Sequence, residues 1–194
     1  MRQLDMRNVV LLATNMNPSL FSERWLMRND IVAEEDFLEG AIYAPMVVQV
    51  PTTAFDLLVV AERLQLTLKE GCDSPADLVT AKVRRIVETL PHVPYSAVGL
   101  NYHWRAEPSD RAGFEDRLRT LFLPDDSAFA RHFETPDSMF GGYFSRDALG
   151  MRLRLDVKPT NPQENGKRVD ALSYKFNFHR DLSESDSVTE IIEV

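Results

Sequence analysis

Charged and imidazole side chains occupy every second position in several segments of the chain, and this is the clearest chemical pattern in the sequence. In residues 151–158, apolar side chains alternate with Arg152, Arg154, Asp156 and Lys158. Successive side chains of a β-strand point to opposite faces of its sheet. The alternation therefore predicts a polar sheet face, and its candidate binding residues are Lys69, His103, Arg105, Arg152, Arg154, Lys175 and His179.

This predicted polar face is basic, although the chain as a whole is acidic. Its strands supply several cations but one acid: the cations are Lys69, Arg105, Arg152, Arg154, Lys158 and Lys175, and the acid is Asp156. Like charges that lie opposite each other on neighbouring strands repel by roughly 0.2–1 kcal/mol per pair. Solvent, neighbouring acids or an anionic partner must therefore offset the repulsion.

Three interpretations of this face are open from the sequence. It can be an ordinary solvated face, a contact surface for a protein or a second copy of the chain, or a surface for phosphate groups or nucleic acid. The aromatic side chains of the same strands are predicted on the opposite face. Single-stranded nucleic acids are bound by aromatic side chains that lie among the basic ones, so this placement weakens the nucleic-acid interpretation.

The sequence contains no motif that predicts catalysis, a cofactor or a metal. A dinucleotide-binding glycine fingerprint, a phosphate-binding loop and a nucleophile elbow are all missing. Cys72 has no second cysteine with which to form a C-x-x-C pair, and the histidines at 92, 103, 132 and 179 do not share one helical turn. We therefore expect no cofactor, no metal and no catalytic residue, which favours a protein that is not an enzyme.

A site assembled from loops is the one enzymatic option that these observations leave. Its expected components are the polar segment 161–166 and the pair Gly141 and Gly142, which lies between Phe140 and Tyr143. The glycine pair predicts a turn or bulge rather than a phosphate-binding loop, because no helix start follows it directly.

The composition is that of an ordinary globular protein. The 194 residues are 44% hydrophobic and 27% charged, which excludes a disordered chain, collagen and a coiled coil and fits a single domain, 1–194. The net charge of −8 predicts weak non-specific binding to nucleic acid. One cysteine predicts a reducing, cytoplasmic compartment, and no apolar run approaches the roughly 20 residues of a membrane span.

Periodic segments predict the elements that position the polar face. Strands are expected at residues 9–13, 46–50, 55–61, 64–69, 95–107, 140–145, 151–158 and 172–179. Helices with an apolar stripe are expected after Asn17-Pro18, from Ser74-Pro75 to about 90, over 110–122 and from 183 onward.

In this order the segments 1–94 and 95–194 each consist of a strand, a helix, three strands and a helix. The last helix of each segment begins with a serine followed by an aspartate three residues later, at Ser74 and Asp77 and at Ser183 and Asp186; this is also what generic helix capping predicts. The element order is similar to that of TATA-binding-protein-like domains. We expect an α+β fold: a curved antiparallel sheet with helices on one face, in two pseudo-symmetric βαβββα halves. Such a likeness carries no function by itself.

The sequence therefore predicts a non-catalytic interaction or assembly subunit that acts through the polar sheet face or a sheet edge. A protein partner or a homo-oligomer is expected, and a membrane is not. The alternative is a nucleic-acid or anion-binding module that uses Arg105, Arg152, Arg154 and Lys175 of the same face.

Overall fold

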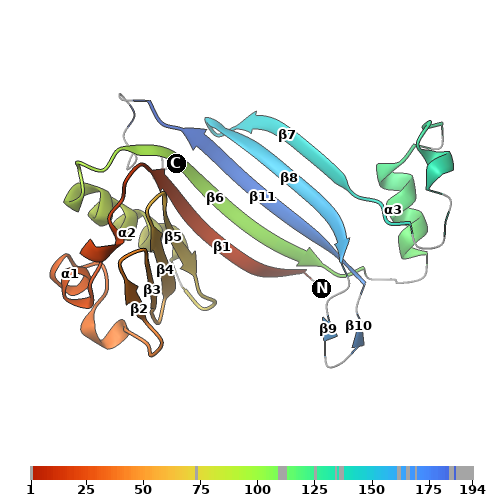
Figure 1. Ribbon diagram of the computed structural model, residues 1–194. Coiled ribbons are helices and arrows are strands. Elements are labelled where there is room, and N and C mark those ends of the chain that lie inside the picture. Colours follow the sequence, from red (N-terminus) through yellow and green to blue (C-terminus); the bar gives the residue numbers. More distant parts are fainter. Residues whose placement is uncertain are drawn as a thin grey trace.

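The computed structural model describes residues 2–72, 74–108, 113–124, 126–133, 135, 138–160, 163–164, 167–168, 170–183 and 186. A nine-stranded, open antiparallel sheet dominates the fold, with strand order β2-β3-β4-β5-β1-β6-β11-β8-β7 (Figure 1). All of the pairings within it are antiparallel. The expectation of a mixed α and β fold with an antiparallel sheet is confirmed.

The strands follow the periodic segments, except that the first begins at Arg2 and not at the predicted residue 9. Those of the first part of the chain are β1 (Arg2–Ala13), β2 (Ile42–Ala44), β3 (Val47–Pro51), β4 (Phe55–Val60) and β5 (Arg63–Leu68). Those of the second part are β6 (Tyr95–Ala106), β7 (Gly142–Ala148), β8 (Met151–Thr160) and β11 (Ala171–Asp181). The short strands β9 (Gln163–Glu164) and β10 (Lys167–Arg168) pair with each other outside the main sheet. The short strand β2 was not predicted separately.

The described helices are α1 (Glu23–Arg28), α2 (Pro75–Thr89) and α3 (Phe114–Phe122), with 3-10 turns at Pro18–Leu20, Glu34–Asp36 and Ala130–His132. The helix expected after Asn17 is split in two. Asn17 caps only the 3-10 turn, and Ser22 starts α1 by accepting a hydrogen bond from Trp25 N at 3.3 Å. Ser74 precedes α2 but makes no side-chain capping bond. The helix predicted from residue 183 falls outside the described residues apart from its first positions.

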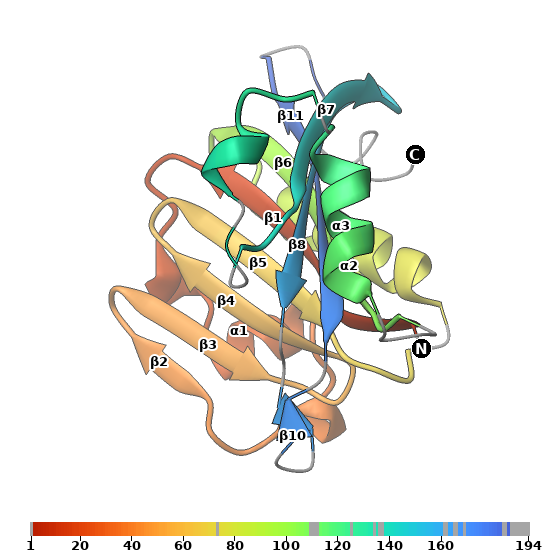
Figure 2. The ribbon, with the colours of Figure 1, turned by 90° about the vertical axis from the view of Figure 1, so that its right-hand side faces the viewer.

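The strand registers separate apolar from polar side chains as the alternation predicts. Leu100 and Leu153 both lie opposite Phe178, and Leu66 lies opposite Val9. Residues that oppose each other in an antiparallel pair share a face. The apolar face packs against α1 and α2 and, at the far end of β8, against α3; Figure 2 shows α2 and α3 on the same side of the long strands.

The buried core is concentrated under the first part of the chain. Within the described residues, Met151 is the one member of the main buried cluster beyond residue 98. The apolar face of the second part is less covered, and Trp104 on β6 remains 40% exposed. Among the described residues, the apolar face of β6, β11 and β8 is therefore only partly covered.

Replacing Leu149 with asparagine is expected to stabilise the protein. Leu149 and Gly150 form the two-residue turn between β7 and β8, with φ of 55° and 67°. Left-handed conformations at both positions favour an Asn-Gly pair, and leucine adopts them at a cost. Leu149 is 72% exposed, so little packing is lost. Chemical denaturation should show that Leu149→Asn raises the free energy of unfolding by about 0.5–1 kcal/mol. The control is Leu121→Asn: an equal gain there would show that the loss of an exposed leucine, and not the relief of the turn, is the cause.

Candidate functional site

The registers place the predicted binding residues on one face of the sheet. Lys175 lies opposite His103 and Asp156, Arg154 opposite Asn177, and Arg152 opposite His179. Arg105 lies opposite Ser173 on the same face, and Lys69 follows the end of β5, where it pairs with Asp56. Side chains from residues 69–179 of the chain are therefore brought together across β5, β6, β11 and β8.

A row of three asparagines crosses the centre of this polar face. Asn101 Nδ2 on β6 donates to Asn8 Oδ1 on β1 at 2.8 Å, and Asn177 Nδ2 on β11 donates to Asn101 Oδ1 at 2.8 Å. Asn8 is only 8% exposed, so its amide oxygen needs the hydrogen bond from Asn101. The row, which was not predicted from the sequence, fixes the register of three neighbouring strands.

Acids on neighbouring strands neutralise much of the basic charge of the polar face. Each ion pair joins a cation of the predicted set, or Lys158, to an aspartate: Lys69–Asp56 at 3.2 Å, Arg105–Asp5 at 3.7 Å, Arg152–Asp147 at 3.1 Å and Lys158–Asp156 at 2.7 Å. Of the three ways of offsetting the repulsion that the sequence left open, neighbouring acids therefore account for these cations: β1, β4 and β7 supply Asp5, Asp56 and Asp147, which could not be assigned to this face before the strand order was known. Within the described residues, Arg154 and Lys175 have no ion pair.

The two histidines of the face have different surroundings. His179 Nε2 lies 3.0 Å from Asp181 Oδ1. Partial burial lowers the pKa of His103 below its ordinary value, and the positive charge of Lys175 lowers it further. The negative charge of Asp5 opposes this shift. His103 is therefore a neutral ring at pH 7, and it adds no charge to the face.

A wide groove lies on the opposite, helix-bearing face, between α3 and the ends of β6 and β11. Its volume is about 1000 Å³, and its apolar walls include Trp104, Tyr174, Phe176 and Leu121. Arg2 and Arg117 also line it. The strand alternation predicted that these aromatic side chains face the helices, but not that α3 leaves them accessible.

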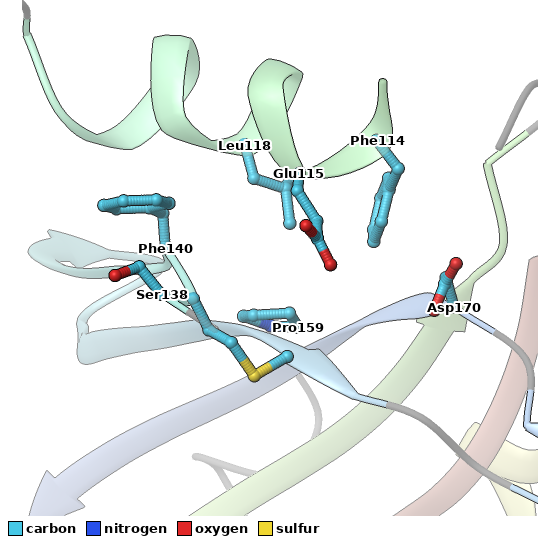
Figure 3. A pocket seen from close by; sticks show the side chains of 8 residues that line it. Phe114, Glu115, Leu118, Ser138, Phe140, Pro159 and Asp170 are labelled. Carbon is cyan, nitrogen blue, oxygen red and sulfur yellow. The ribbon is translucent and has the colours of Figure 1, made fainter. Parts of the chain in front are cut away.

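A second cavity lies under α3, and its size bears on the option of a loop-built enzyme site. Figure 3 shows Glu115 pointing into the gap between Leu118 and Pro159, with Ser138 on one side of Pro159 and Asp170 on the other. The volume of this cavity is about 20 Å³, which holds one water molecule rather than a substrate.

The glycine pair at 141 and 142 lies next to this cavity but does not form the expected turn. Gly142 is the first residue of β7, Gly141 precedes it, and β7 pairs with β8 in unbroken register from Gly142 onward. The predicted turn or bulge is therefore corrected to the start of a strand. Of the polar segment 161–166, residues 161, 162, 165 and 166 lie outside the described residues.

The strand β7 forms one edge of the sheet and carries exposed aromatic side chains on both faces. Tyr143 is 65% exposed and lies opposite Asp156 on the polar face, whereas Phe144 is 51% exposed and lies opposite Leu155 on the apolar face. Met139, just before the strand, is 56% exposed. We call Met139, Tyr143, Phe144 and Arg146 the β7 edge. The sequence predicted a strand at residues 140–145 but not that it would lie at an edge.

Metal sites and membrane-spanning helices are not found within the described part of the chain. No group of three or more His, Cys, Asp or Glu side chains could hold a metal ion there. None of the described helices is long and apolar enough to cross a membrane. Comparison with models of known protein families and with curated protein sequences gives no match for this chain.

Proposed function

We propose that this chain is a non-catalytic interaction or assembly subunit, and that the β7 edge is its contact surface. The observation that carries the proposal is an edge strand of seven residues with Tyr143 and Phe144 exposed on its two faces. The proposal includes a reducing, cytoplasmic setting, which rests on the single cysteine of the sequence.

The physical argument is the unsatisfied hydrogen-bonding capacity of an edge strand. Alternate residues of β7 turn their backbone N–H and C=O groups away from β8, its one neighbour among the described strands, toward any strand that pairs with it. The strand contains no proline, and its flanking aromatic side chains supply apolar area for a partner. By contrast, the cations of the polar face are largely paired with acids, so the edge is the better supported of the two predicted surfaces.

We also propose that the fold is built from two similar halves, as in TATA-binding-protein-like domains. The strand order supports this, because β5, β4 and β3 follow β1 on one side, and β11, β8 and β7 follow β6 on the other. In this arrangement β3 and β7 occupy equivalent places, but among the described strands only β3 is covered by a further one, β2.

The proposed contact is tested by the mass of the native complex. We expect the native chain to form species heavier than its monomer mass of 22.2 kDa, both in cell extract and after purification. Light scattering would measure the mass of these species. The double variant Tyr143→Glu with Ser145→Glu places two charges on the edge, which opposes strand pairing, and should return the mass to that of the monomer. The carboxylate introduced at position 145 would lie opposite Arg154, and the one at position 143 would lie opposite Asp156, which is paired with Lys158. Because like charges opposite each other destabilise a sheet, circular dichroism must first establish that the variant keeps its sheet.

The matched control is Leu121→Glu, which changes an equally exposed apolar side chain on α3 in the groove wall. If this control dissociates the complex and the edge variant does not, the contact lies in the groove and the proposed surface is wrong. A monomer of native sequence in both extract and purified form would contradict the proposed function as a whole.

The alternative proposal, a nucleic-acid or anion-binding module, rests on Arg154 and Lys175, which have no ion pair among the described residues. It requires salt-sensitive binding to an oligonucleotide, because phosphate contacts release counterions. The logarithm of the binding constant falls linearly with the logarithm of the salt concentration, and each lost phosphate contact makes this slope shallower by about 1. The double variant Arg154→Ala with Lys175→Ala should therefore make it shallower by about 2 if both side chains bind phosphate. Binding that is absent, or independent of salt, would exclude the alternative. Lys69→Ala is the control, since Asp56 neutralises Lys69.

A further inference from the structure

The two edges of the sheet carry opposite charges. At the end opposite β7, the segment before β2 runs along β3: Leu38 N donates to Pro51 O at 3.0 Å, and Phe37 bridges to Thr52. This segment contributes Glu34, Glu35 and Glu39, and residues 34–44 contain no lysine or arginine. We call Leu38, Ile42, Tyr43 and Met46, together with these glutamates, the β2 edge.

Apolar side chains are exposed along the β2 edge as they are along the β7 edge. Leu38 is 42% exposed, Ile42 48% and Met46 76%. Within the described residues, Glu34, Glu35 and Glu39 have no ion pair. The edge therefore combines an accessible strand, apolar area and an uncompensated negative charge.

At the β7 edge the uncompensated charge is positive. Arg152 is neutralised by Asp147 and Lys158 by Asp156, whereas Arg146 and Arg154 have no ion pair within the part of the chain that the structure describes. Arg146 lies on the apolar side of β7 and Arg154 on the polar side of β8, so cations flank the edge on both faces. Figure 1 shows β7 and β2 at opposite edges of the sheet.

We propose that the occupant of the β7 edge is the β2 edge of a second copy of this chain, so that copies associate head to tail. This inference rests on the proposed function and names the partner. Complementary charge selects between the possible pairings: two β2 edges would bring their glutamates together, and two β7 edges would bring their arginines together, whereas the mixed pairing brings arginines to glutamates. A head-to-tail contact is heterologous, so it produces rings or open chains of copies.

The contact is expected to be weak to moderate in strength. The exposed apolar side chains of the two edges each offer roughly 100 Å² at half exposure, so the interface falls near or below the lower limit of about 1,200 Å² for stable complexes. Association should therefore depend on protein concentration. It should also weaken at high salt, because the glutamates and arginines are exposed.

The test uses two variants that each block one edge. The β7-blocked variant is Tyr143→Glu with Ser145→Glu, which repels the acidic β2 edge. The β2-blocked variant is Ile42→Lys with Met46→Lys, which repels Arg146 and Arg154. Circular dichroism and thermal unfolding establish that both fold, and sedimentation velocity gives their masses separately and as an equimolar mixture.

Head-to-tail pairing predicts that each variant alone remains at 22.2 kDa, with association at least about tenfold weaker than in the native chain. The mixture should form a dimer that grows no further, because each variant keeps the edge that the other has lost. A dimer of the β2-blocked variant alone would overturn the inference in favour of pairing between two β7 edges. A mixture that stays monomeric would overturn it as well, because neither intact edge would then bind the other. If the β7 edge instead binds a different protein in extract, the proposed function stands and the inference fails.

Discussion

Gly141→Ala is expected to be among the most destabilising single substitutions in this protein. A Cβ at position 141 would be driven into the backbone carbonyl oxygen of Val157 on β8. A backbone atom cannot rotate away as a side chain can, so β7 must separate locally from β8. Forcing extra volume into a packed contact costs typically 1–3 kcal/mol and occasionally more, and the upper end of that range is expected here. Chemical denaturation would measure the loss.

The local consequence of this substitution is as informative as its total cost. Amide hydrogen exchange of β7 and β8 should accelerate, whereas exchange in β1 and β6 should change only in line with global stability. Gly99→Ala is the matched control, because a Cβ there meets its nearest atom, Phe178 O, at an ordinary 3.7 Å. Gly99 lies within β6, where alanine is generally preferred to glycine by about 0.5–1 kcal/mol. Equal losses for the two alanines would contradict the steric explanation.

Asn101→Leu is expected to cost about 2–3 kcal/mol, since a buried polar group left without a partner costs roughly 1–3 kcal/mol. The substitution removes both hydrogen bonds of Asn101 and leaves Asn8 Oδ1 and Asn177 Nδ2 without them. Water can reach the half-buried Asn177 but has little access to Asn8, so most of the cost arises at Asn8. Thermal or chemical unfolding would measure it.

A second substitution separates hydrogen bonding from the packing of the new side chain. In the double variant Asn8→Leu with Asn101→Leu, both ends of the bond between β1 and β6 become apolar, and such a pair can be close to neutral. The double variant should therefore be more stable than Asn101→Leu alone. If the stability losses of Asn8→Leu and Asn101→Leu instead add up in the double variant, the asparagine row does not stabilise the sheet through its hydrogen bonds.

These two sites show that the sequence predicted the strands but not the contacts between them. The alternation at residues 151–158 and 172–179 predicted β8 and β11 and the face on which each side chain lies, because side-chain direction along a strand is a local property. Neither the asparagine row nor the contact of Gly141 with Val157 is local. Each depends on which strand lies beside which, and nothing in the spacing of Asn8, Asn101 and Asn177 indicates that they are neighbours.

The charge of the polar face shows the same distinction. The sequence correctly grouped Arg152, Arg154 and Lys175, since all three lie at alternate positions of adjacent predicted strands. It did not identify the acids that neutralise Arg152 and Arg105, because Asp147 and Asp5 reach the face only through the pairing of β7 with β8 and of β1 with β6. Counting charges along single strands omits the acids of the strands that lie between and beside them.

The sequence by itself determined most of the long strands, the separation of polar from apolar faces and the lack of catalytic motifs, because these depend on residue types at short separations. Only the tertiary structure decided that β2 and β7 are the edges of the sheet, that the aromatic face of β6 and β11 is left partly open, and which acids neutralise which bases. These are consequences of strand order, which is selected by the burial of the whole apolar surface at once and not by any one segment.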